Sequence, residues 1–135
     1  MRTALKCRNC CLALCALRMP LYSCHKPTLQ EQYAAARHCY VAYDAALKLI
    51  APAAFEHAGL DPALVKDSWS TDIGAAYDMG KELGMSPEAV GADLERARLA
   101  YLGAHSGRTN AAAKLAALKY DVNDCLGDDY GRPND

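Results

Sequence analysis

Apolar residues recur at alternating intervals of four and three in several stretches of this chain, and this spacing constrains the fold more than any other feature. The clearest series is made up of Leu29, Tyr33, Ala36, Tyr40, Tyr43, Leu47 and Ile50. Three further series are Val90, Leu94, Ala97, Tyr101 and Ala104; Ala111, Leu115, Leu118, Val122 and Cys125; and a looser one, Val65, Trp69, Ile73, Ala76, Gly80 and Leu83. This spacing aligns side chains along one face of an α-helix, and such a face must be buried against other helices.

Residues that start and stop helices separate these series. Thr28 and Glu31 fit a capping box at the start of the first helix, and Pro52 ends that helix. Asp61 and Ser86, each followed by proline, start two more helices. The expected helices cover residues 29–51, 52–58, 62–83 and 87–104, and a last one, capped by Ser106, Thr109 or Asn110, ends near Leu126; the glycines that stop helices are Gly59, Gly84 and Gly127. The sequence therefore predicts an all-α fold, a small antiparallel helical bundle with one extra short helix over residues 25–127, followed by a flexible polar tail, 128–135.

The composition agrees with a helical core. Hydrophobic residues make up 52% of the chain, but it has one Phe and one Trp against eight Tyr. Many of the remaining apolar residues are alanines, which favour helices, whereas strands favour Val, Ile, Phe and Thr. Small residues at Ala75, Ala76 and Gly80 would also let a facing helix approach closely.

The first 24 residues differ from the rest of the chain. They contain four basic residues, no acidic residue and five of the seven cysteines. A basic start precedes the apolar run 10–17, which is the order of a bacterial secretory signal. Residues 21–24, Leu-Tyr-Ser-Cys, look like a lipoprotein processing box with Cys24 as the candidate lipidation site. We expect a signal or lipoprotein leader at 1–24; the alternatives are a translation start at Met19 or a cytosolic tail.

The other two cysteines, Cys39 and Cys125, lie near the two ends of the remaining chain. Each falls on or beside the apolar face of a predicted helix, the first and the last long one. In an oxidising compartment an even pair of cysteines tends to be bridged, so we expect a Cys39–Cys125 disulfide. The alternative is two free buried thiols in a cytosolic protein.

A second reading rests on residues 82–90, Glu-Leu-Gly-Met-Ser-Pro-Glu-Ala-Val, with Leu94, Arg96 and Arg98 after them. This segment resembles the helix-turn-helix of bacterial sigma factors and DNA-binding response regulators. The resemblance implies that the helix after Ser86 enters the major groove, where Arg96 and Arg98 contact DNA. The acidity of residues 25–135, which contain all 16 acidic residues, opposes phosphate binding. The alternative is an ordinary helical hairpin.

Five tyrosines are candidates for lining a small-molecule pocket: Tyr33, Tyr40 and Tyr43 on one helix face, with Tyr77 and Tyr101 opposite. The alternative is that they are core residues whose hydroxyls reach a partner or solvent. No Glu-x-x-His pair or Cys-x-x-Cys-His motif occurs, so we expect neither a metal nor another cofactor.

Taken together, the sequence predicts a non-enzymatic exported protein, periplasmic or lipid-anchored, that acts by binding a protein or a small ligand. Nucleic acid is not the favoured partner, and membrane contact is expected only through a lipid anchor. The alternative function is that of a cytosolic helix-turn-helix regulator of DNA. The sequence identifies no particular ligand.

Overall fold

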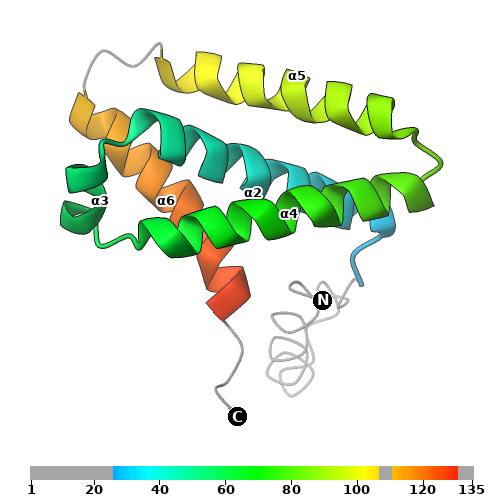
Figure 1. Cartoon of the computed structure of the whole chain (residues 1–135), viewed down its shortest axis with the longest axis horizontal. Helices are drawn as coiled ribbons and strands as arrows, with labels where there is room; N and C mark the ends of the chain where they lie inside the picture. The colour runs from blue at the N-terminus through cyan, green and yellow to red at the C-terminus, as the bar shows by residue number, and fades with distance from the viewer. Residues whose placement is uncertain (1–25, 107–110, 131–135) are drawn as a thin grey trace, which may run out of the picture.

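A computed structural model describes residues 26–106 and 111–130, and within these ranges the chain forms helices joined by turns, with no strand (Figure 1). The helices are α2 (Leu29–Leu49), α3 (Pro52–His57), α4 (Pro62–Glu82), α5 (Pro87–Ser106) and α6 (Ala111–Tyr130). The predicted all-α bundle with one short helix is therefore confirmed. The leader at 1–24, including Cys24, lies outside the described residues.

The predicted capping residues make the expected contacts. The hydroxyl of Thr28 accepts a hydrogen bond from the Glu31 amide at 3.2 Å, and the Glu31 carboxylate accepts one from the Thr28 amide at 2.7 Å. Asp61 accepts a hydrogen bond from the Ala63 amide at 2.9 Å at the start of α4. Gly59 and Gly84 have φ angles of 68° and 80°, which side-chain-bearing residues rarely adopt, so glycine suits both turns.

Helix α2 lies at the centre of the bundle and packs against α4, α5 and α6. All eight residues from 39 to 46 are buried, so this half of α2 is enclosed on every side. The sequence predicted burial along one face only. The difference arises because three of the eight residues are alanines, Ala42, Ala45 and Ala46, each completely buried, and their small side chains let neighbours approach around the whole helix.

The long helices run back and forth along α2. In Figure 1, α4 runs opposite to α2, α5 returns in the same direction as α2, and α6 crosses at a slant. Helices α2 and α4, which are joined through the short helix α3, are therefore antiparallel, and so are α4 and α5, which are joined by a short turn.

The predicted apolar face of α4 is confirmed only in part: Val65, Ala76 and Gly80 are buried as expected. Ser68 and Asp72 are buried, while Trp69 and Ile73, which were expected to be core, are only partly buried. The small side chain of Ser68 fits between the helices, whereas the indole of Trp69 lies beside the ring of Tyr40, with centroids 5.9 Å apart. Hydrophobic spacing alone cannot distinguish these two adjacent faces of one helix.

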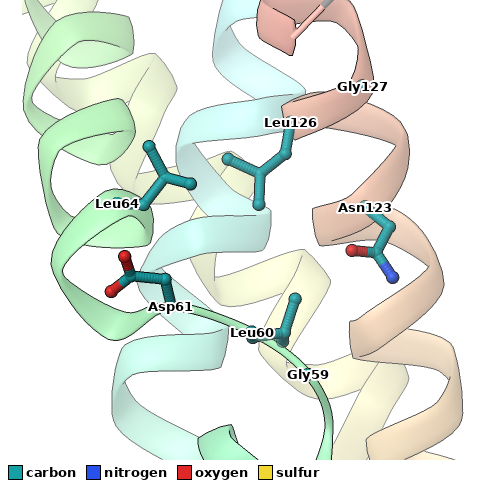
Figure 2. A pocket seen from close by; sticks show the side chains of 7 residues that line it. All are labelled: Gly59, Leu60, Asp61, Leu64, Asn123, Leu126 and Gly127. Atoms are coloured by element: carbon teal, nitrogen blue, oxygen red, sulfur yellow. The ribbon is translucent and has the colours of Figure 1, made fainter.

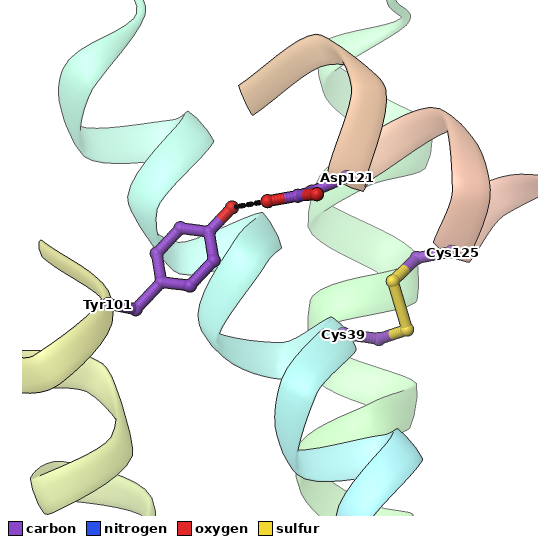
Figure 3. Close-up of a disulfide and its surroundings, with 4 residues drawn as sticks. All are labelled: Cys39, Tyr101, Asp121 and Cys125. Carbon is purple, nitrogen blue, oxygen red and sulfur yellow. Dashed lines mark hydrogen bonds between the residues drawn. A yellow bond between two sulfur atoms is a disulfide. The ribbon is translucent and has the colours of Figure 1, made fainter. Parts of the chain in front are cut away.

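A disulfide joins Cys39 of α2 to Cys125 of α6, whose Cα atoms are 5.6 Å apart (Figure 3). The pairing predicted from the sequence is thus present in the structure. Leu118, Val122 and Leu126 of α6 are buried in the same apolar cluster as the two cysteines. The disulfide therefore reinforces a contact that is also apolar.

Helix α6 does not end where the sequence predicted. The expected stop was Leu126 followed by Gly127, but α6 continues to Tyr130. The proposed flexible tail, 128–135, is therefore helical over its first three residues. A glycine costs about 1 kcal/mol relative to alanine inside a helix, which is too little to stop a helix that packing holds in place.

Helices α4 and α5 approach each other closely at Gly80. A Cβ atom at this position would lie 2.4 Å from Cγ2 of Val90, a fully buried β-branched residue. We predict that Gly80→Ala lowers the free energy of unfolding by about 1–3 kcal/mol, because Val90 cannot move aside without disturbing the core. Urea unfolding measures the change.

Gly74→Ala is the matched control, since it lies in the same helix and a Cβ there meets nothing within 4 Å. It should raise stability by up to about 1 kcal/mol through helix propensity alone. Equal effects of the two substitutions would contradict the close α4–α5 contact.

Candidate functional site

The five tyrosines predicted to line a pocket are divided between two core clusters. Tyr43 is completely buried in the cluster that contains the disulfide, whereas Tyr33 and Tyr40 lie in the other cluster. Tyr101 is partly buried and touches both clusters, and Tyr77 is 37% exposed. None of the five lines either of the two cavities described below. Tyr33, Tyr40 and Tyr43 are buried core residues, as the alternative interpretation expected.

Tyr33 joins α2 to α5 through a polar contact. Its hydroxyl donates to Asp93 at 2.8 Å, and Arg37 donates to the same carboxylate oxygen at 2.7 Å. Burial, followed by the hydrogen bond to Asp93, raises the pKa of Tyr33 to about 12. Partial burial acts to raise the pKa of Asp93, but the hydrogen bonds from Arg37 and Tyr33 outweigh it, so this pKa lies below its usual value. Both shifts favour the neutral phenol beside a charged carboxylate at neutral pH.

The two arginines assigned to DNA in the alternative reading bind carboxylates of α5. Arg98 donates to both oxygens of Glu95, at 2.7 and 2.6 Å, and Arg96 lies 3.4 Å from Asp93. Figure 1 shows α5 folding back along α4 after the turn at Gly84. A helix-turn-helix instead crosses its two helices at about 90–120°. This geometry resembles a helical hairpin.

A polar cluster lies where the last turns of α5 meet α6. The Tyr101 hydroxyl donates to the Asp121 carboxylate (Figure 3), and the Tyr101 and His105 rings stack with centroids 4.1 Å apart. Nδ1 of His105 lies 2.9 Å from the carbonyl oxygen of Tyr101, so this nitrogen must bear the hydrogen. Nε2 of His105 lies 3.8 Å from Asp121 Oδ2. The cluster fixes His105, which is 7% exposed, in one orientation.

One cavity, of about 340 Å³, lies between the α3–α4 turn and α6 (Figure 2). Its lining residues are Gly59, Leu60, Asp61, Leu64, Asn123, Leu126 and Gly127. Asp61 supplies a carboxylate, but this side chain already caps α4 through the Ala63 amide. Little apolar surface is left open in it, since Leu60 and Leu126 are buried in the core. This cavity has few groups free to hold a ligand.

A second cavity, of about 350 Å³, lies where the ends of α2 and α5 meet α3 and the start of α6; we call it the helix-end cavity. It is lined by Leu49, Ile50, Ala51, Ala54, His105, Ser106, Lys114, Leu115 and Leu118. Six of these nine residues are apolar, and none is acidic. Lys114 is partly buried there and forms no ion pair with any residue that the structure describes. Its size falls within the range of small-molecule sites.

Comparison with protein-family models, with curated proteins and with solved structures finds no match to this chain. Among the described residues, no three His, Cys, Asp or Glu side chains are grouped as a metal site requires. No helix within the described ranges is long and apolar enough to span a bilayer. The candidate site therefore rests on the geometry of the helix-end cavity alone.

Sequence reasoning did not identify this cavity. Its residues come from four helices that are distant in sequence, and the apolar pattern of each single helix does not show that their ends meet. Two signals were visible: Lys114 in an otherwise apolar first turn of α6, and His105 at the end of α5. Each is unremarkable until the fold brings them to one cavity.

Proposed function

We propose that this chain is an exported helical binding protein that holds a small, mainly apolar ligand in the helix-end cavity. The observation that carries the proposal is the cavity itself, whose wall consists mostly of Leu, Ile and Ala side chains. Burying apolar ligand surface against such a wall contributes roughly 25 cal/mol per Å². A ligand that fills the cavity gains affinity without any change in the bundle.

The walls of the cavity are firmly held, which supports a preformed site. Ile50 and Leu118 belong to the apolar cluster that also contains the Cys39–Cys125 disulfide, and both are buried. On another side, His105 is fixed by Tyr101. Rigid walls lower the entropy lost on binding, because few side chains must be ordered when the ligand enters.

Export is supported by two independent features. Disulfides persist in extracytoplasmic compartments and are rare in the cytosol, and Cys39 and Cys125 are paired here. The composition of residues 1–24, basic and then apolar, is that of a secretory leader. We propose a periplasmic or lipid-anchored location on these grounds.

The ligand site is tested by filling it. We predict that Ala54→Leu, which places a larger side chain in the cavity, weakens binding of the neutral fluorescent probe N-phenyl-1-naphthylamine at least tenfold. Fluorescence titration measures the affinity. Ala53→Leu is the matched control, because Ala53 is its neighbour in α3 but is exposed, and binding should not change. Equal binding by wild type and both variants would contradict the proposed site.

Export is tested by expressing the full chain in a bacterial host and measuring its intact mass. We predict a product that has lost residues from 1–24, and cysteines 39 and 125 that react with iodoacetamide only after reduction. The same chain without residues 1–24, made in the cytosol, is the control for reduced thiols. A product that begins at Met1, with both thiols alkylated before reduction, would contradict export.

A further inference from the structure

The helix-end cavity is lined by one basic side chain, that of Lys114, in addition to its apolar wall. Its nine lining residues include Lys114 and His105 but no carboxylate. Lys114 has no acidic partner among the described residues, although it is partly buried. A bound anion would supply the acidic partner that Lys114 lacks among the described residues.

The position of Lys114 along its helix adds to this effect. It is the fourth residue of α6, in the first turn, which contains no acidic residue. The aligned peptide dipoles make the start of a helix favourable for negative charge and unfavourable for a lysine. The start of α6 therefore has excess positive character at the edge of the cavity.

The other polar groups near the cavity already have partners. Nδ1 of His105 lies 2.9 Å from the carbonyl oxygen of Tyr101 within the last turns of α5. Asp121, the carboxylate nearest to His105, accepts the hydroxyl of Tyr101. Lys48, in the last turn of α2, is paired with Asp44 at 2.8 Å. Lys114 is thus the lining group whose charge is left for a ligand.

We infer that the helix-end cavity binds amphipathic anions, with a short aliphatic chain against Ile50, Ala54 and Leu118 and a carboxylate head beside Lys114. This inference rests on the proposed ligand-binding function and names the chemical class of the ligand. The apolar wall holds the chain, and the ammonium of Lys114 selects the charge of the head group through a charge-assisted hydrogen bond.

The test compares three probes that share one chain and differ only in the head group: octanoate, octanol and octylammonium. In isothermal titration calorimetry at low salt, octanoate should bind about tenfold more tightly than octanol. Octylammonium should bind most weakly of the three. Lys114→Gln should remove the preference, so that octanoate and octanol bind with equal affinity. Lys119→Gln is the matched control, because Lys119 is exposed on the same helix and outside the cavity.

The outcomes separate this inference from the proposed function. Equal binding of the three probes, tighter binding of octylammonium, or an unchanged preference in Lys114→Gln would overturn the anion selectivity and leave an apolar site in place. Binding of the neutral naphthylamine without binding of any octyl probe would also overturn it. Failure of every probe, the naphthylamine included, would overturn the ligand-binding function as well.

Discussion

The burial of α2 on all sides is the interaction on which the rest of this structure depends. Residues 39–46 form an unbroken buried run, and α4, α5 and α6 each pack against α2. The small side chains of Ala42, Ala45 and Ala46 allow this close approach, while Tyr43 fills the space beside them. Enclosing one helix lets a short chain build two core clusters along that helix from few large residues.

The outer helices are attached to α2 in different ways. Helix α6 is held by apolar burial of Leu118, Val122 and Leu126 together with the disulfide. Helix α5 buries only Val90, Leu94 and His105, so polar contacts contribute more to its position. Those contacts are the bonds of Asp93 to α2 and of Tyr101 to α6. The helix-end cavity forms where these two kinds of attachment meet, because no large side chain fills the space between the helix ends.

Much of the fold could be predicted from the sequence because local signals agreed with one another. The capping box at Thr28, the cap at Asp61 and the turn glycine Gly84 each depend on residues close in the chain. The Cys39–Cys125 pairing could be predicted because both cysteines fell near apolar helix faces. The burial of α2 on all sides could not be predicted, because it depends on how three separate helices meet around α2. For the same reason the burial of Ser68 and Asp72 in the middle of α4, in place of Trp69 and Ile73, could not be predicted.

The candidate site could not be predicted from the sequence. Tyrosines on shared helix faces indicated a pocket, but the helix-end cavity is lined instead by residues at the ends of helices, among them Leu49 and Ser106. Leu49 and Ser106 carry no periodic signal, and although Ile50, Leu115 and Leu118 belong to periodic series, only the fold brings the lining residues together.

Amide hydrogen exchange tests the central position of α2 most directly. If α2 is enclosed, the amides of residues 39–46 exchange only when the whole bundle unfolds, and they are the slowest in the chain. The amides of residues 92–100, in the less buried α5, exchange faster through local opening. Exchange of residues 39–46 at the same rate as residues 92–100, under conditions where the bundle is folded, would contradict the account.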